Sequence, residues 1–292
     1  MRKFILRGQR HSPSGRAEVG PTIHRSPQVE RGKPVNSSGG VEASMPACEL
    51  GGPSSLPSLV GAGDGYERWA PTYDCFPNPL LSREERHVAP LLPTLQNRRV
   101  LDLACGTGRW LTRLLVAGAR SVVGIDLSSA MLRVAAHKEG LSGSVVQADC
   151  LRLPFRASTF DFAICSFALG HIRDLRSAAA EVAQVMKPDS DLFVADLHLE
   201  AFARGWRTGF RDRHGAVQVD SQSYSVEDII RAFHSGGFSC VTHVGLCLGN
   251  PEQPIFAGTG RQHLFQAACR VPAILFCHFK RVPQLTVSQR RP

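Results

Sequence analysis

An apolar run that ends at two glycines constrains this chain more than any other stretch. Residues 100–110 read VLDLACGTGRW, and Gly106 and Gly108 follow directly on the strand-like run. Glycine allows positive φ and a close approach of the backbone to a ligand, and the residues from Arg109 onward have helical spacing. The stretch therefore predicts a strand, a ligand-binding loop, and a helix whose N-terminus faces the ligand.

Strand-like and helix-like segments alternate through the rest of the chain. We expect strands over residues 99–104, 121–125, 144–148, 160–166, 192–197, 239–244 and 273–279, and helices over 109–116, 129–138, 175–186 and 225–236. Strict alternation predicts an α/β fold with a doubly wound, mainly parallel sheet covered on both faces. Ligands of such sheets bind beyond the carboxyl ends of the strands, which is where the glycine loop falls.

The domain boundaries follow from composition. Residues 1–64 are rich in Gly, Pro and Ser and have Phe4 as their only aromatic residue, so we expect a disordered tail, with a presequence or a start near Met45 as alternatives. The folded domain is predicted over 65–285, with a core at 100–197, an insertion or lid at 198–224, and a short basic tail at 286–292.

Cysteine usage and charge exclude several classes of protein. The nine cysteines form neither a CxxC pair nor a Cys/His cluster with zinc spacing, so we expect reduced thiols, no metal and a cytoplasmic location. No apolar run is long enough to span a bilayer. The formal net charge of +9 is spread thinly, so no stable nucleic-acid complex is expected. Composition leaves the oligomeric state open.

An acidic residue inside the opening stretch argues against a phosphate ligand. A dinucleotide-binding loop would read GxGxxG, whereas here the third position is Leu111. The carboxylate of Asp102 would repel a pyrophosphate but would attract an ammonium group. The ligand should therefore be cationic at this end.

Two further carboxylates follow the next two predicted strands. Asp126 stands twenty residues after Gly106, where a carboxylate accepts hydrogen bonds from the two hydroxyls of a ribose. Asp149 is placed to accept from an adenine amino group, with Leu127, Met131 and Leu151 around the ring. An amino acid, a ribose and an adenine together describe S-adenosylmethionine.

Five motifs and one upstream segment resemble the class I S-adenosylmethionine-dependent methyltransferases of the type 11 group. The motifs are LDLACGTG (101–108), VVGIDLSSAML (122–132), QADCLRLPF (147–155), FDFAICSFALGHI (160–172) and VMKPDSDLFVADLH (185–198), and YERWAPTYD (66–74) is similar to the segment that closes over the cofactor. The resemblance covers residues 66–279 and implies the strand order 3-2-1-4-5-7-6 with an antiparallel seventh strand. It also implies a cofactor site formed by Asp102, Ala104, Gly106, Thr107, Gly108, Asp126, Leu127, Met131, Asp149, Cys150 and Leu151, with Ser166 and Phe167 near the donated methyl group.

Methyl transfer from a sulfonium is an in-line displacement, so a general base is optional. His171, just past the strand over 160–166, is the best candidate because its ordinary pKa lies near neutrality. Tyr73 is a second candidate, and Asp196 and His198 are weaker ones. A structural role for His171, as a cap of its loop, is the alternative.

The acceptor should be chosen by residues 198–224, which are too many for an ordinary connection. Trp206, Arg207 and Phe210 in this segment would suit an aromatic or anionic small molecule. The alternative is an insertion whose aromatic residues pack on the sheet.

The predicted function is transfer of a methyl group from S-adenosylmethionine to a small molecule, and three alternatives remain. An RNA methyltransferase is disfavoured because residues 165–168, CSFA, lack the Asn or Asp with Pro-Pro and an aromatic residue that such enzymes usually carry. A regulatory or assembly protein that binds the cofactor without turnover is the second alternative. An NAD oxidoreductase is disfavoured by Asp102 and Leu111.

Overall fold

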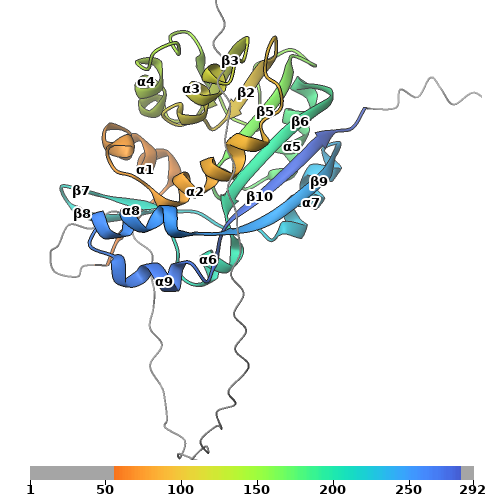
Figure 1. Ribbon diagram of the computed structural model, residues 1–292. Coiled ribbons are helices and arrows are strands. Elements are labelled where there is room, and N and C mark those ends of the chain that lie inside the picture. The colour runs from red at the N-terminus through yellow and green to blue at the C-terminus, as the bar shows by residue number, and fades with distance from the viewer. Residues whose placement is uncertain (1–55, 284–292) are drawn as a thin grey trace, which may run out of the picture. The chain divides into compact units, whose positions relative to one another are not determined.

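A seven-stranded sheet forms the centre of the domain in the computed structural model, which describes residues 56–283 (Figure 1). Its strands are β2 (Arg99–Leu103), β3 (Ser121–Asp126), β4 (Val145–Gln147), β5 (Phe160–Ser166), β6 (Met186–Leu197), β9 (Phe238–Cys247) and β10 (Pro272–Arg281). They lie in the order β4-β3-β2-β5-β6-β10-β9, and β10 alone runs in the direction opposite to the other six strands. Numbered along the chain, this is the order 3-2-1-4-5-7-6. The predicted doubly wound fold is confirmed.

The two faces of the sheet carry separate hydrophobic cores, because successive side chains of a strand point to opposite faces. Val100 of β2 packs in the core that includes Trp110 of α3 (Arg109–Val116) and Val88 of α2 (Pro79–Val88). Leu101, the next residue, packs in the core formed with α5 (Leu175–Val185) and α7 (Val226–Ser235). Helices thus cover both faces, and the ligand edge is left at the carboxyl ends of the parallel strands.

The helices begin where the sequence supplies caps. Ser128 Oγ accepts a hydrogen bond from Met131 N at 3.2 Å at the start of α4 (Ser129–Ala136), and Ser225 Oγ accepts one from Asp228 N at 3.1 Å at the start of α7. Such side chains satisfy N–H groups that have no partner within the helix. The predicted starts of these two helices agree with their caps to within one residue.

A second sheet, which the sequence patterns do not predict, contains three strands in the order β1-β8-β7. Its strands are β1 (Ser58–Val60), β7 (Gly209–Asp212) and β8 (Gly215–Val219), and β1 pairs in parallel with β8. Ordered structure therefore begins before the boundary predicted at residue 65, since Val60 packs against buried Val217 and Val219. The rest of the predicted tail, 1–55, and the basic tail, 286–292, lie outside the described residues.

The structure contains further helices that the sequence patterns do not predict. Before β2 the chain forms α1 (Ala62–Trp69), a 3-10 helix (Ala70–Cys75), α2 and a second 3-10 helix (Ala89–Leu91). After β6 comes α6 (Leu199–Ala203), and between β9 and β10 lie α8 (Gln253–Gly258) and α9 (Phe265–Ala268), with 3-10 helices at Asn250–Glu252 and Gln262–Leu264. No helix between residues 56 and 283 is long and apolar enough to cross a bilayer.

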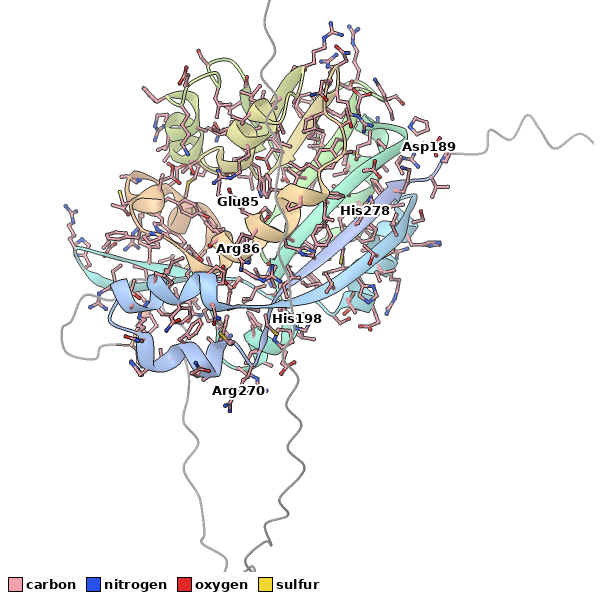
Figure 2. The ribbon with its side chains drawn as sticks, in the orientation of Figure 1. Glu85, Arg86, Asp189, His198, Arg270 and His278 are labelled. Carbon is pink, nitrogen blue, oxygen red and sulfur yellow. The ribbon has the colours of Figure 1, made fainter. Side chains whose placement is uncertain are left out.

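Helix α2 is fixed to the insertion between β9 and β10 by an ion pair. Glu252 is buried. Its Oε1 accepts hydrogen bonds from Arg86 Nε at 3.1 Å and Nη2 at 2.7 Å, and its Oε2 accepts one from Nη2 at 2.9 Å. Figure 2 labels Arg86 on α2, next to Glu85. A bidentate pair of this kind fixes both position and orientation. This ion pair helps to fix the position of α2, the helix that also carries Glu84.

Candidate functional site

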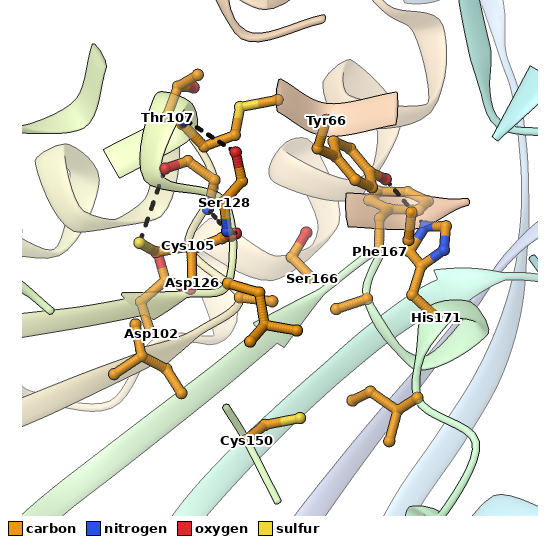
Figure 3. A pocket seen from close by; sticks show the side chains of 18 of the residues that line it. Tyr66, Asp102, Cys105, Thr107, Asp126, Ser128, Cys150, Ser166, Phe167 and His171 are labelled. Atoms are coloured by element: carbon orange, nitrogen blue, oxygen red, sulfur yellow. Dashed lines mark hydrogen bonds between the residues drawn. The ribbon is translucent and has the colours of Figure 1, made fainter. Parts of the chain in front are cut away.

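A cavity of about 300 Å³ lies at the carboxyl ends of β2, β3 and β5 (Figure 3). Its walls include nearly all of the residues predicted to hold the cofactor, together with both predicted catalytic residues. These are Asp102, Ala104, Gly106, Thr107, Asp126, Leu127, Met131, Asp149, Cys150, Leu151, Ser166, Phe167, Tyr73 and His171. In the view of Figure 3, Asp102 and Asp126 lie on the left, and Tyr66, Phe167 and His171 on the right.

Gly108 is the exception among the predicted cofactor residues. It does not line the cavity, and it precedes α3 with φ of 78°. A Cβ atom at this position would lie 2.9 Å from Leu141 Cδ1 and 3.2 Å from Ala135 Cβ. Glycine is therefore required here for the turn and for close packing of the loop against α4, with no contact to the cavity.

Asp102 presents an unpaired oxygen next to the cavity. The residue is 2% exposed, and within the described part of the chain its Oδ2 atom has no hydrogen-bond partner. Burial raises the pKa of Asp102 well above its usual range, and nearby Arg109 opposes this shift. A cationic group in the cavity would stabilise the carboxylate and lower this pKa again. The position fits an ammonium ligand.

Asp126 is oriented by the glycine loop. Its Oδ2 accepts from Gly106 N at 2.8 Å, and its Oδ1 accepts from Ser128 N at 2.9 Å. Burial raises the pKa of Asp126, and these backbone hydrogen bonds oppose the shift. Each carboxylate oxygen keeps a further lone pair for a ligand. The arrangement fits two neighbouring hydroxyl groups.

The cavity also has an apolar slot, formed by Leu127, Met131 and Leu151. Met131 is buried, whereas Leu127 and Leu151 are 62% and 39% exposed although they line the cavity. Asp149 is fixed at its edge, because its Oδ1 accepts from Leu151 N at 2.8 Å. Exposed leucines beside a hydrogen-bond acceptor fit a flat, partly polar ring such as adenine.

Two non-glycine residues with positive φ follow strands at the cavity. Ala104, after β2, and Phe167, after β5, both have φ of 54°. This region is disfavoured for residues with a Cβ atom, and residues with such backbone strain occur most often at functional sites. Phe167 N donates to Ala195 O of the neighbouring strand at 2.7 Å, which secures the turn.

His171 forms a hydrogen-bonded chain with Tyr66. Its Nδ1 lies 3.1 Å from the carbonyl oxygen of Asp220, and its Nε2 lies 2.9 Å from the hydroxyl of Tyr66. Because the carbonyl can only accept, Nδ1 carries the hydrogen, and neutral Nε2 accepts from Tyr66. Burial lowers the pKa of His171 and raises that of Tyr66, so both neutral forms are favoured.

The sequence patterns did not identify Glu84, which is fully buried beside the cavity. Its carboxylate accepts from Arg109 Nη2 at 2.7 Å, from Trp110 Nε1 at 2.9 Å and from Ser166 Oγ at 2.9 Å. The glutamate therefore fixes the start of α3 and the hydroxyl at the end of β5. Its helix, PLLSREERHV, carries adjacent Glu84 and Glu85, and sequence offers no sign of which one is buried.

The segment 66–74 closes over the cavity. Glu67 accepts from Ser128 Oγ at 2.9 Å and from Ala130 N at 3.0 Å. Asp74 accepts from Thr107 Oγ1 at 2.8 Å and pairs with Lys138 Nζ at 2.7 Å. Both glycine-loop and α4 contacts thus hold this segment in place.

A second, smaller pocket of about 110 Å³ adjoins the cavity. Tyr66, Tyr73, Leu81 and Phe167 line both spaces. Trp206 and Arg207, two of the predicted acceptor residues, line the second pocket. Phe210, the third, lines neither and instead stacks on Trp69 with ring centroids 5.1 Å apart, which supports the pocket wall from behind.

The two weaker catalytic candidates lie outside both spaces. Asp196 accepts from Gly170 N at 3.0 Å and from Leu197 N at 2.6 Å, and burial raises its pKa to about 6. His198 Nδ1 accepts from Glu200 N at 3.1 Å and so caps α6. Among residues 56–283, no group of three or more His, Cys, Asp or Glu side chains is arranged to hold a metal ion.

Comparison with known proteins assigns the family. A family model described as a methyltransferase domain matches residues 100–189. The chain is 33% identical over 189 residues to the ubiquinone/menaquinone biosynthesis C-methyltransferase UbiE of Syntrophotalea carbinolica, covering 59% of this chain and 79% of that relative. The chain belongs to the class I S-adenosylmethionine-dependent methyltransferases. The resemblance noted in the motifs is confirmed.

Two other proteins are similar to this methyltransferase. It is 36% identical over 120 residues to the O-methyltransferase cnsE of Penicillium expansum, a match that covers 39% of this chain and only 44% of that protein. A solved S-adenosylmethionine-dependent methyltransferase from Mesorhizobium loti shares the fold, with a TM-score of 0.55, 22% identity, and coverage of 69% of this chain and 100% of that one.

Proposed function

We propose that this methyltransferase binds S-adenosylmethionine in the cavity and transfers its methyl group to a small-molecule acceptor. The observation that carries the proposal is the order of groups along the cavity: the unpaired Oδ2 of Asp102, the oriented carboxylate of Asp126, and the apolar slot beside Asp149. These groups complement an ammonium, a ribose and an adenine in turn. The loop also fits, since a Cβ atom at Gly106 would meet nothing within 4 Å and so faces open space.

A small acceptor is supported by the size of the second pocket and by the relatives. The pocket is about a third of the volume of the cavity, at about 110 against 300 Å³, and meets it at Tyr66, Tyr73 and Phe167. The relatives are named as an O-methyltransferase and as a C-methyltransferase of ubiquinone and menaquinone biosynthesis. An acceptor in the second pocket would thus face the end of the cavity where Ser166 and Phe167 lie.

The cofactor supplies an electrophilic methyl group on its sulfonium. Tyr66 lines both spaces, which supports a role for its hydroxyl in accepting the proton that an acceptor hydroxyl loses. As it does so, Tyr66 passes its own proton to Nε2 of His171, and the resulting imidazolium keeps its Nδ1 bond to the Asp220 carbonyl. Phe167 and Tyr73 also line both spaces. We assign the base role to His171, acting through Tyr66.

The deciding experiment is calorimetric titration of the full chain with S-adenosylmethionine and then with S-adenosylhomocysteine. We expect micromolar binding of both, and a loss of at least about 100-fold in affinity in Asp126→Ala, because the carboxylate would accept from two ribose hydroxyls and a hydrogen bond to a charged group contributes about 1.5–3 kcal/mol. Asp174→Asn is the matched control, since Asp174 caps α5 and does not line the cavity. Equal binding by Asp126→Ala and the control would overturn the ribose assignment.

A further inference from the structure

The second pocket has an aromatic wall and a single charged residue. Trp69, Tyr73, Phe167 and Trp206 line it, and so does Arg207. No Asp or Glu belongs to its lining among the residues that the structure describes. Aromatic walls favour a flat apolar ligand, and an unopposed guanidinium favours an anion.

The guanidinium of Arg207 is held firmly on one side. Its Nη1 donates to the carbonyl oxygens of Phe202 at 2.6 Å and of Trp206 at 2.8 Å. Its central carbon lies 3.8 Å from the centroid of the Phe202 ring, which covers one face. The group is thus oriented before any ligand arrives, so binding an anion would cost little side-chain entropy.

The described protein groups bond to only one of the terminal nitrogens of the same guanidinium. Within residues 56–283, the hydrogen bonds of Arg207 use Nη1 alone, and no carboxylate pairs with it. The nearby basic residue Arg204 differs, because its Nη2 pairs with Glu200 at 2.9 Å on the surface of α6. The Nε and Nη2 donors of Arg207 form the fork that matches a carboxylate or a similar oxyanion.

We propose that the methyl acceptor is an aromatic compound with an anionic substituent, and that Arg207 binds this substituent in the second pocket. The inference rests on the proposed function and adds the class of substrate. Tyr66 and Phe167 mark the junction with the cavity, so the reacting group of the acceptor lies there and its anion lies toward Arg207. The segment 198–224 selects the acceptor through this one charge.

The test compares an anion with its neutral counterpart. Binding of 4-hydroxybenzoate and of 4-hydroxybenzamide is measured by calorimetry at pH 7.5, with and without saturating S-adenosylhomocysteine. We expect the acid to bind at least about tenfold more tightly than the amide, since a charge-assisted bond is roughly twice as strong as a neutral one. Equal binding of the two compounds, or no binding of the acid at millimolar concentration, overturns the proposal.

Variants of Arg207 then test whether this residue causes the preference for the acid over the amide. Arg207→Gln should bring the ratio of acid to amide affinity to about one, Arg207→Lys should keep a reduced preference, and Arg204→Gln should leave the ratio unchanged. A preference for the acid that persists in Arg207→Gln would overturn the assignment. Arg207→Lys keeps a cation and a donor, so it serves if Arg207→Gln fails to fold.

The two proposals fail separately. A protein that does not bind S-adenosylhomocysteine overturns the proposed function, while the comparison of acid and amide without cofactor still tests the pocket. Cofactor binding together with equal affinities for acid and amide overturns only the acceptor class.

Discussion

The hydroxyl of Tyr66 lies 2.9 Å from Nε2 of His171, although the two residues are 105 positions apart in the chain. Tyr66 comes from α1 and His171 from the turn after β5, so closure of the N-terminal segment completes the pair. Their rings also meet edge to face, with centroids 5.2 Å apart. The hydrogen bond between Tyr66 and His171 therefore depends on the position of this N-terminal segment.

The first prediction concerns the pH dependence of turnover. A base must be neutral, and burial lowers the pKa of His171 below its ordinary 6.5, so kcat should fall only as the pH drops through this lowered value. His171→Gln should lose this acidic limb and reduce kcat by about 10²- to 10⁴-fold, with little change in cofactor affinity. Rate profiles between pH 5 and 9 measure both effects.

Control variants distinguish a role of His171 as a general base from a structural role. Tyr66→Phe keeps the ring and removes the hydroxyl, so it should lower kcat while it leaves cofactor binding near the wild-type level. His198→Gln should keep the wild-type profile, because His198 caps α6 and lines neither pocket. Unchanged kcat and an intact acidic limb in His171→Gln would exclude general-base catalysis by this residue.

The features of the fold that could be predicted from the sequence are those that depend on short-range patterns. Most strands of the large sheet contain a short apolar run in the sequence, and Asp102 and Asp126 can be placed because they stand at or next to the ends of such runs. Glu84 could not be assigned, since its burial depends on Trp110 and Arg109 from another helix. Strand β1 has three residues and exists through its pairing with β8, more than 150 positions away.

The second prediction concerns the buried carboxylate of Glu84. Its removal leaves the Arg109 guanidinium, the Trp110 N–H and the Ser166 hydroxyl without their common acceptor. Breaking a buried pair from one side costs about 3–5 kcal/mol, so Glu84→Ala should lower the free energy of unfolding by this amount in urea titrations. Glu85→Ala should cost less than about 1 kcal/mol, because the Glu85 side chain is 32% exposed and pairs with Arg113, which is 38% exposed. Similar losses for the two variants would contradict this account.

The third prediction uses the raised pKa of Asp196. Burial raises this pKa from 3.8 to about 6, so the folded state binds a proton more tightly than the unfolded chain. The contribution of Asp196 to the free energy of unfolding is therefore fully present below about pH 4, and it is lost as the pH rises to about 6. Asp196→Asn cannot ionise, so the stability of the variant relative to wild type should increase between pH 4 and 6.

The measurement is the difference between the two unfolding free energies across this range. Other acids contribute equally to both proteins and cancel. Asp161→Asn is the control of opposite sign, because hydrogen bonds from Arg99 N and Lys187 lower the pKa of Asp161. A constant difference between wild type and Asp196→Asn would show that Asp196 ionises normally.

The fourth prediction separates backbone strain from contact with the cofactor. Gly106 and Gly143 have φ of 54° and 74°, and a Cβ atom at either would meet no atom within 4 Å. Alanine in this left-handed region costs about 1–2 kcal/mol, so both alanine variants should lose similar stability. Only Gly106 lines the cavity, where the added methyl group would take space from the ligand. Calorimetry should show weaker binding of S-adenosylhomocysteine by at least about tenfold in Gly106→Ala, and unchanged binding in Gly143→Ala. Equal affinities in the two variants would mean that the ligand does not approach this loop.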